Sequence, residues 1–402
     1  MRILIYGINF SPELTGIGKY SGEMADWLAN QGHEVTVITA PPYYPEWSVR
    51  KEYKNFFSIE SCKNLTIIRC PLYVPSKPSA MKRLLHLLSF SISSFIPVLG
   101  SAFWKPDVVI QVVPTLFCSL QTLLLTKLVR AKSVIHIQDY EVDAMFELSI
   151  AKTSLFEKNA YLIEKKILNC FTVVSTISKG MLDRASRKGI DEKKLLFFPN
   201  WSEVALFENQ SKDSKFLIDL GINPKKKLVL YSGNMGEKQG LESVVHAANC
   251  FKKNHDVQFI MIGDGVVKEK LKKLSGDLNL TNISFFPLLP YSDLPNLLAS
   301  ADCHLVIQKK GAADAVLPSK LTNILAVGGN SVITASSDTT LGLLCAEFPG
   351  IAVLVDPESV DALVAGIERA LLMPMPNKIA KKYAKEFLDK DMILSRFEKN
   401  IG

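Results

Sequence analysis

Short apolar runs and helical stretches alternate along this chain, and the alternation begins twice. The first run covers residues 3–6 and is followed by a glycine-containing loop, a helical stretch that ends at Gly32, and a β-branched run over 34–39. The second begins at residues 228–231 and repeats the same order, with its next run over 258–262. Each of these orders predicts a βαβ unit with a right-handed connection, in which the first loop lies at the carboxyl edge of a parallel sheet.

Four more β-branched runs in the first half are separated by helical lengths, at residues 65–69, 107–112, 133–138 and 172–175. This alternation predicts a doubly wound parallel sheet. Because the pattern restarts in a chain of 402 residues, we predict two α/β domains facing across a cleft. We place the N-terminal domain at 1–205 and the C-terminal domain at 206–377. We interpret the lysine-rich residues 207–227 as a linker, and we expect a basic helix at 378–402 to pack back on the first domain.

Residues 84–103 form an unusually apolar segment without Asp, Glu, Lys or Arg, preceded by Lys82 and Arg83. The segment is long enough to cross a bilayer. Its serines, His86 and Pro97 make insertion less favourable, and a single span would place the βαβ units on opposite sides of the membrane. We therefore predict a buried helix pair whose Lys82/Arg83 end touches an anionic membrane surface. A wholly buried core helix is the alternative.

The composition, 48% hydrophobic and 22% charged, is that of a folded globular protein and excludes disorder. The net charge of +7 is unevenly placed. Residues 1–200 contain 24 Lys and Arg against 17 Asp and Glu, whereas residues 201–402 contain 23 of each. A basic first half suits a phosphate-rich ligand or an anionic membrane surface. Nucleic acid is disfavoured, because no groove-reading motif or aromatic interleaving accompanies the charge.

The cysteines and the first residues bear on the compartment. Seven cysteines are scattered without CxxC spacing, so neither a zinc site nor a disulfide framework is indicated, and a reducing compartment fits them. The chain begins with a strand and a glycine turn instead of a signal sequence. Both observations predict a cytoplasmic protein.

Two glycine-bounded loops are candidates for anion binding. Ser319 and Lys320 open a helical stretch that ends at Gly328, and the N–H groups at such a helix start, together with Lys320, could hold an anion. An ordinary helix with one surface lysine is the alternative. In the first loop, Gly16 and Gly18 allow a ligand to approach the backbone closely. Their spacing is not GxGxxG, so a tight turn explains them equally well.

Taken together, these motifs resemble a family. Nearly the whole chain resembles a glycosyltransferase of family 4 with the GT-B fold, an arrangement of two Rossmann-like doubly wound domains; the resemblance is carried by residues 15–18, 232–242, 262–265, 301–302 and 310–334. Three further stretches are most similar to exopolysaccharide glycosyltransferases of the colanic-acid type, namely 43–45, 136–143 and 317–323.

The resemblance implies retaining transfer of a sugar from a nucleotide diphosphate sugar, bound by the second domain, without a metal or other cofactor. A departing diphosphate gathers negative charge, which protein cations and N–H dipoles must then stabilise. Lys238 falls near the family's phosphate lysine, and Lys320 is a second candidate. The donor-binding residues that we infer are Gly16, Gly18, Gly233, Asn234, Lys238, Gly263, Asp264, Ser319, Lys320 and Asn323.

Two departures from the family pattern affect the catalytic residues. A pair of Glu residues is usual in the 310–334 stretch, but Ala315 and Asn323 take their places here. Asn323 can still bond a hydroxyl, and Asp314 is the nearest replacement for the first Glu. After the run 133–138, the usual His-Asp pair is replaced by Gln138 and Asp139.

Three catalytic candidates remain, namely Asp139, Lys238 and His136. Asp139 can orient a sugar hydroxyl. His136 lies two residues before Gln138 on the same face of the predicted strand, where a histidine is more often a core residue, so we rank it lower. The leaving phosphate can itself take the acceptor's proton.

These inferences favour an enzyme that adds one sugar to a polyprenyl-linked oligosaccharide at the cytoplasmic face of the membrane. GDP-fucose is the first candidate donor, and UDP-linked hexoses or N-acetylhexosamines come next. Two alternatives remain open. One is a GT-B nucleotide-sugar epimerase that needs no acceptor, and the other is a non-catalytic component that binds nucleotide sugars.

Overall fold

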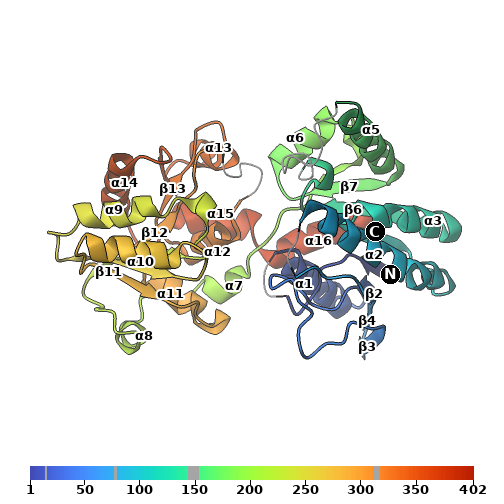
Figure 1. Cartoon of the computed structure of the whole chain (residues 1–402), viewed down its shortest axis with the longest axis horizontal. Coiled ribbons are helices and arrows are strands. Elements are labelled where there is room, and N and C mark those ends of the chain that lie inside the picture. Colours follow the sequence, from blue (N-terminus) through green and yellow to red (C-terminus); the bar gives the residue numbers. More distant parts are fainter. Residues whose placement is uncertain (14–15, 77–78, 144–153, 312–316) are drawn as a thin grey trace. The chain divides into compact units, whose positions relative to one another are not determined.

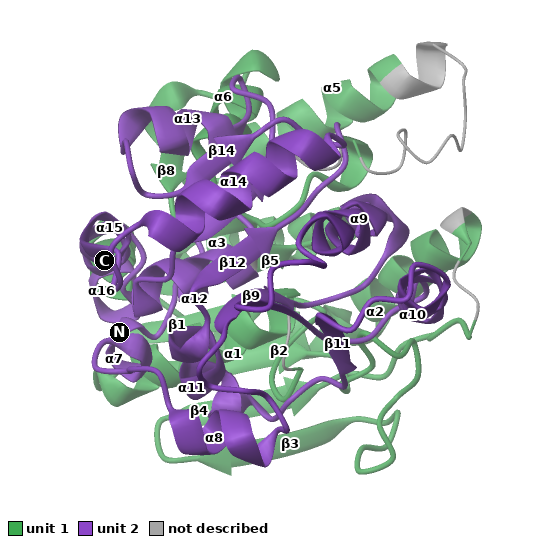
Figure 2. Cartoon of the chain, turned by 90° about the vertical axis from the view of Figure 1, so that its left-hand side faces the viewer, with its two compact units in different colours: residues 1–199, 394–402 green, residues 200–393 purple. Residues whose placement is uncertain are grey.

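The computed structural model describes residues 1–13, 16–76, 79–143, 154–311 and 317–402. The chain divides into two compact units, coloured separately in Figure 2. Unit 1 comprises Met1–Pro199 with Leu394–Gly402, and unit 2 comprises Asn200–Ile393. Each unit is a parallel or mainly parallel sheet with helices packed on it, as Figure 1 shows. The two α/β domains predicted from the restarting pattern are therefore confirmed.

Unit 1 is built on a sheet of eight strands in the order β3-β4-β2-β1-β5-β6-β7-β8, in which only the β3–β4 pair is antiparallel. The strands are β1 (Arg2–Tyr6), β2 (Glu34–Thr39), β3 (Ser58–Cys62), β4 (Leu65–Arg69), β5 (Val108–Val113), β6 (Lys132–Ile137), β7 (Val173–Thr176) and β8 (Leu195–Phe197). All six residues of β5 are buried, as expected of a central strand covered on both faces. The four runs predicted in this half correspond to β4, β5, β6 and β7.

Helices of unit 1 that the structure describes are α1 (Gly16–Asn30), α2 (Ala80–Gly100), α3 (Ser119–Val129), α5 (Ser154–Cys170) and α6 (Lys179–Arg187), with most of α16 (Lys390–Ile401). The segment predicted as a buried helix pair is one helix, α2, which continues through Pro97. Only a third of the apolar window within Met81–Phe103 is buried, and its mean hydropathy is 1.6. The prediction of burial was therefore wrong for most of this segment.

Unit 2 is built on a wholly parallel sheet in the order β11-β10-β9-β12-β13-β14. The strands are β9 (Lys227–Ser232), β10 (Val257–Ile262), β11 (Ile283–Phe286), β12 (Cys303–Val306), β13 (Ser331–Thr334) and β14 (Val353–Val355). The helices are α7 (Val204–Phe207), α8 (Ser214–Asp219), α9 (Glu242–Cys250), α10 (Lys268–Asp277), α11 (Leu294–Ser300), α12 (Ser319–Val327), α13 (Thr340–Glu347), α14 (Val360–Leu372) and α15 (Lys378–Phe387). Along β9, Leu228 and Leu230 enter one hydrophobic cluster and Val229 and Tyr231 another, because successive side chains point to opposite faces.

The unit boundaries differ from the predicted domains in three places. The division falls at Pro199 and Asn200 instead of 205 and 206. The segment 207–227 is not a linker, because Phe207 and Leu217 are buried in the core of unit 2. The helix predicted at 378–402 is two helices. The first, α15, belongs to unit 2 through its buried alanines, whereas Phe397 in α16 stacks on Phe198 of unit 1 at 3.8 Å between ring centroids.

Candidate active site

The loops after β9 and β10 pass each other in unit 2 at a point where neither has a side chain. Gly233 and Gly263 have φ angles of +145° and +144°, which side-chain-bearing residues rarely adopt. A Cβ on Gly263 would lie 1.9 Å from the carbonyl oxygen of Gly233. The Gly233 N–H donates to the carbonyl of Ile262 at 2.9 Å. These glycines therefore fix how the two loops meet at the carboxyl edge of the sheet.

The same two loops make a second close contact just after the first, between Met235 and the segment from Asp264 to Gly265. The Met235 N–H donates to the Asp264 carbonyl at 2.8 Å, and a Cβ on Gly265 would lie 2.4 Å from the Met235 carbonyl oxygen. The Lys268 ammonium donates to the Gly263 carbonyl at 2.7 Å. Asn234 and Asp264 are exposed on this surface. The structure thus brings four predicted donor-binding residues together where the two loops meet, namely Gly233, Asn234, Gly263 and Asp264.

Lys320 lies at the same edge, in the first turn of α12. Its Nζ is 4.3 Å from the centroid of the Tyr231 ring and would be 3.7 Å from a Cβ placed on Gly233. Burial lowers the pKa of Lys320 to about 8. Burial penalises the charged form, and no acidic group in the described part of the chain offsets this penalty. An anion bound here would therefore gain strongly from Lys320.

Lys238 is held in a short 3-10 turn (Glu237–Gln239) that follows the same β9 loop. Its side chain is exposed, and its carbonyl accepts the Lys309 N–H at 3.1 Å. The Gly236 N–H donates to the Gln239 side chain at 3.1 Å, which fixes the turn from inside. The backbone of Lys238 is therefore well fixed, while its long side chain remains in solvent.

Asn323 lies one turn after Lys320 on α12 and is half-buried. Its Oδ1 accepts the Ser202 hydroxyl at 2.8 Å. With the oxygen engaged, the side chain offers amide N–H groups to a ligand, whereas a Glu would offer acceptors. Ser319 is the first residue of α12; its side chain, and all of Asp314 and Ala315, lie outside the described residues.

The glycines predicted in unit 1 have different roles. Gly16 begins α1 with a φ of +62° and open space where a side chain would be. Gly18 is crowded instead, because a Cβ there would lie 2.6 Å from the Cβ of Glu13. Glu13 is buried and accepts the N–H groups of Tyr43 at 3.2 Å and Tyr44 at 3.1 Å. Burial raises the pKa of this carboxyl, which the sequence pattern did not single out.

His136 and Asp139, both proposed at the end of β6, lie in opposite environments. His136 is buried, with its Nδ1 3.0 Å from the Ser175 hydroxyl and its ring 4.8 Å from the ring of Phe198. Burial lowers its pKa to about 3, so the imidazole is neutral at physiological pH. This is the environment of the core histidine that we considered as the alternative. Asp139 is exposed, directly after the strand.

Tyr140, Glu141 and Asp143 of this motif bond to other parts of unit 1. The Tyr140 hydroxyl donates to a backbone carbonyl of α6 at 2.8 Å. Glu141 accepts the Leu116 N–H at 2.8 Å, and burial raises its pKa. Asp143 is buried and accepts from the Lys188 ammonium at 3.0 Å. Because Asp139 is exposed, whereas Glu141 is half-buried and Asp143 is buried, Asp139 is the motif carboxylate that is most accessible to a ligand.

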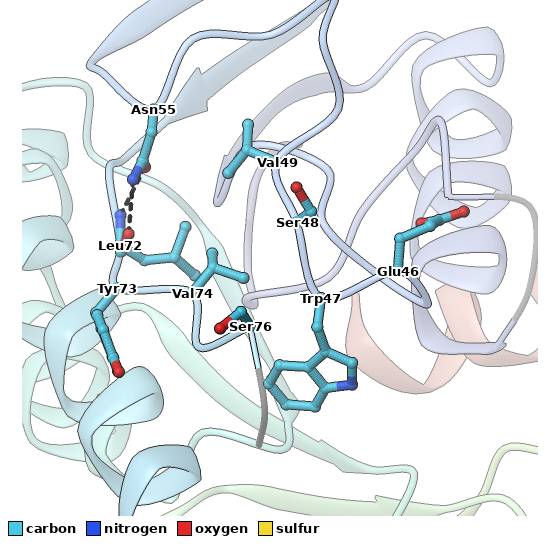
Figure 3. Close-up of a pocket in the computed structure, with 9 residues that line it drawn as sticks. All are labelled: Glu46, Trp47, Ser48, Val49, Asn55, Leu72, Tyr73, Val74 and Ser76. Atoms are coloured by element: carbon cyan, nitrogen blue, oxygen red, sulfur yellow. Dashed lines mark hydrogen bonds between the residues drawn. The ribbon is translucent and has the colours of Figure 1, made fainter.

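Unit 1 also contains a pocket of about 510 Å³, shown in Figure 3, between residues 46–49 and residues 72–76. The Asn55 amide also lines the pocket and bonds to the backbone of Leu72 at 2.7 and 3.0 Å. Trp47 contributes an indole and has a φ of +51°. The Arg83 guanidinium lies 5.5 Å from its ring centroid. The pocket therefore contains an aromatic ring that makes a cation–π contact with Arg83.

Comparison with known proteins decides the family. The family described as "Glycosyl transferases group 1" matches residues 213–387, and the "Glycosyl transferase 4-like domain" matches residues 15–201. The chain is 53% identical over 406 residues to the glycosyl transferase WcaI of Escherichia coli (strain K12), whose name assigns it to colanic acid biosynthesis. The match covers 100% of both chains. The chain belongs to the family 4 glycosyltransferases.

Solved structures confirm the GT-B fold of this glycosyltransferase. Anabaena Alr3699/HepE, solved in complex with UDP, superposes with a TM-score of 0.72 over 100% of this chain and 99% of that chain, at 14% identity. Sucrose-phosphate synthase from Thermosynechococcus elongatus gives a TM-score of 0.71 over 99% and 98% of the two chains, at 15% identity. At such identities the similarity shows the fold alone.

Several residues of this glycosyltransferase that form its candidate sites were not predicted. Tyr231 looked like an ordinary strand residue, and its ring contact with Lys320 depends on how β9 and α12 pack. Trp47 and Glu13 lie in loops without periodicity, where nothing in the sequence indicates which side chain is buried. No group of three or more His, Cys, Asp or Glu side chains that could hold a metal ion occurs in the residues that the structure describes.

Proposed function

We propose that this glycosyltransferase transfers a sugar, with retention of configuration, from a nucleotide diphosphate sugar bound by unit 2. The observation that carries the donor site is the position of Lys320. Its ammonium has a lowered pKa and lies next to Gly233, where the loop has no side chain. The UDP in the HepE structure supports a nucleotide ligand for this fold.

The charge that develops on the leaving diphosphate defines the role of these residues. Lys320, Lys238 and the N–H groups at the start of α12 together supply positive charge. Lys320 contributes most, because a half-buried charge is less screened by water than an exposed one. We propose that these groups serve without a metal ion or other cofactor.

In the proposed reaction, the bond between the sugar C1 and the diphosphate oxygen breaks, and the acceptor hydroxyl oxygen bonds to C1 on the same face. The proton of that hydroxyl passes to an oxygen of the leaving phosphate. Asp139, exposed at the end of β6, orients the acceptor hydroxyl. The neutral, buried His136 is assigned no proton transfer, because its pKa of about 3 is too low for a base at neutral pH.

We propose a polyprenyl-linked oligosaccharide as the acceptor, in surface polysaccharide biosynthesis at the cytoplasmic face of the cell membrane. The name of the WcaI relative supports an exopolysaccharide pathway. The Trp47 pocket is a suitable site for an acceptor sugar, because an aromatic ring presents an apolar face to the C–H groups of a sugar. Trp47→Ala should raise the KM for the acceptor roughly tenfold and leave donor binding unchanged.

The donor is tested by a melting-temperature screen with GDP, UDP and their sugars in the presence of EDTA. A ligand that binds only the native state raises its melting temperature. We expect the largest shift with GDP-fucose, followed by UDP-linked sugars. A protein that no nucleotide stabilises would contradict the proposed donor site.

Turnover then separates transfer from the alternatives. Transfer releases nucleoside diphosphate only when a donor and a lipid-linked acceptor are both present. An epimerase would convert the nucleotide sugar alone, and that result would replace our proposal. A panel of donors and acceptors that yields binding without any release of nucleoside diphosphate would also contradict it.

A further inference from the structure

Helix α2 has two faces of opposite character. On one face Phe90, Ser94 and Val98 are fully buried, and the Ser94 hydroxyl is 2.6 Å from the hydroxyl of Tyr6 on β1. The other face exposes large apolar side chains at helical spacing, among them Ile92, 67% exposed, and Ile96, 80% exposed. The exposed stripe consists of Met81, Leu85, Leu88, Ile92 and Ile96. A helix so exposed lacks the burial that normally stabilises apolar side chains.

Helix α3 extends this apolar surface. It packs against α2, and the Gln121 amide donates to the Ser91 carbonyl at 2.7 Å (Figure 1). Its exposed face carries Leu120, Leu124 and Leu128, the last 70% exposed. Phe103, just after α2, is 94% exposed. We call the exposed side chains of 81–103 and 120–128 the α2–α3 face.

Positive charge surrounds the α2–α3 face. Residues 70–138 contain seven Lys and Arg residues but only one acidic residue, Asp107, whose carboxylate accepts the backbone N–H of Arg2 at 2.7 Å. Exposed basic side chains lie at both ends of the face. Lys82 and Arg83 lie at the start of α2. Lys105 follows the end of α2, and Lys127 and Arg130 lie at the end of α3. An apolar stripe with basic flanks complements a surface of acyl chains and anionic headgroups.

We propose that the α2–α3 face docks this enzyme on an anionic lipid bilayer, with both helices lying in the plane of the membrane surface. The buried polar groups of α2 argue against a membrane span, since Ser94 bonds to β1 and the His86 imidazole lies 2.6 Å from the Tyr73 carbonyl within unit 1. The charge argues against a second copy of the chain as the occupant, because both ends of the face are basic and would repel each other. The proposal stands independently of which nucleotide sugar is used.

Vesicle sedimentation tests the apolar part of the face. Wild-type protein should co-sediment with vesicles rich in phosphatidylglycerol and much less with phosphatidylcholine alone. Ile92→Glu/Ile96→Glu places charges on the stripe without touching the buried face, and it should lower the fraction bound more than about tenfold. The matched control is Ile218→Glu/Leu372→Glu, which changes exposed apolar residues of unit 2 and should bind as wild type does.

The basic part is tested by Lys82→Ala/Lys127→Ala, one change at each end of the face. Binding should fall several-fold per removed charge and depend less steeply on salt than wild type does between about 0.1 M and 1 M, because Arg83, Lys105 and Arg130 remain. Lys215→Ala/Lys225→Ala removes the same charge from exposed sites of unit 2 and should leave vesicle binding unchanged. Nucleotide-induced melting shifts should be the same in all four variants, so a failure of docking is distinguished from a failure of the donor site.

Three outcomes would overturn the proposal. In the first, wild type does not bind anionic vesicles, or the Ile92/Ile96 variant binds as well as wild type. In the second, wild type is a dimer in solution, the Ile92/Ile96 variant is a monomer, and neither binds vesicles. That result would make the α2–α3 face an interface between two copies of the chain. In the third, cell membranes retain the protein after alkaline carbonate extraction, which would indicate a span.

Discussion

The carboxyl edges of the two sheets are built in opposite ways. In unit 2, Gly233 and Gly263 remove side chains where the loops meet, and the ammonium of Lys320 rests on the Tyr231 ring without an acidic partner among the described residues. In unit 1, most polar side chains of the motif at the end of β6 form hydrogen bonds within the unit. Glu141 holds the Leu116 N–H, for example.

This difference supports the proposed division of roles between the two units. The edge of unit 2 is made of glycine backbone and a cation without an acidic partner among the described residues, which suits a diphosphate that must be held tightly while it leaves. In unit 1, Asp139 is the exposed carboxylate of the motif after β6, which suits orientation of a hydroxyl on a varied acceptor. We therefore expect substitutions in unit 2 to affect donor binding and those in unit 1 to affect acceptor binding or turnover.

The largest effect should follow from Gly263→Ala. The new Cβ would lie 1.9 Å from the Gly233 carbonyl oxygen, so one of the two loops must move. We expect a loss of more than about 4 kcal/mol in the free energy of unfolding, or complete loss of nucleotide binding if the loops move apart. Denaturant unfolding and nucleotide titration measure the two results.

Gly276→Ala is the matched control for this substitution. Gly276 lies in α10 with a helical φ and open space around the position of a Cβ. Alanine should raise stability there by about 0.5–1 kcal/mol, because it favours a helix more than glycine does. Equal effects at the two positions would contradict the packing that we describe for the β9 and β10 loops.

Asp139→Asn should have the second-largest effect, on turnover alone. Because the carboxylate is exposed, we expect kcat to fall by about a hundredfold and the free energy of unfolding to change by less than about 1 kcal/mol. Glu141→Gln should do the reverse, with a loss of about 1–2 kcal/mol in stability and a small change in kcat. If both variants lost turnover equally, the distinction between these carboxylates would fail.

Lys320 should make donor binding depend on pH. Burial lowers the pKa of this lysine to about 8, and a diphosphate binds its protonated form. As the pH rises above about 8, the free enzyme loses this proton, so the Kd for GDP or UDP should increase by about tenfold per pH unit. In Lys320→Arg the guanidinium stays charged and the Kd should be flat over the same range. Equal pH profiles for the two proteins would show that Lys320 does not meet the nucleotide.

His136→Gln should have the smallest effect on activity, with kcat within about twofold of wild type. The neutral imidazole has a pKa of about 3 in the folded chain and takes up a proton near pH 6.5 once unfolded. Wild type should therefore lose stability as the pH falls from 6.5 toward 3, because the unfolded state binds the extra proton. The variant should lose less over this range, as urea unfolding at several pH values would show. A large fall in kcat would restore His136 as a catalytic residue.

The regular parts of the fold could be predicted, because periodic burial determines them. The runs that became β1, β9 and β10 follow the pattern of covered parallel strands, and Gly233 and Gly263 come directly after two of them. Lys320 could be placed at a helix start, but its contact with Tyr231 could not, since that contact depends on the packing of β9 against α12. The burial of Glu13 against Gly18 depends likewise on a loop that no periodicity describes.

The errors have a common cause, which is that composition does not report which side of a helix is covered. Residues 207–227 are rich in lysine, yet Leu217 is buried in the core of unit 2, and Phe216 and Leu220 pack against that core. The apolar segment after Arg83 suggested burial, yet α2 exposes a whole stripe that includes Ile92 and Ile96. In both cases tertiary packing decided what local composition left open.

The most direct test of the donor site is a calorimetric titration of GDP and UDP in EDTA at neutral pH, on wild type, Lys320→Met and Lys225→Met. Methionine keeps the apolar stem of Lys320 against Tyr231 and removes the charge, while Lys225 is an exposed lysine of the same unit. We predict that wild type and Lys225→Met bind one of the two nucleotides equally well without metal, and that Lys320→Met binds it at least about fiftyfold more weakly. Binding by Lys320→Met that equals wild type, or binding by wild type only when a divalent metal is added, would contradict the account.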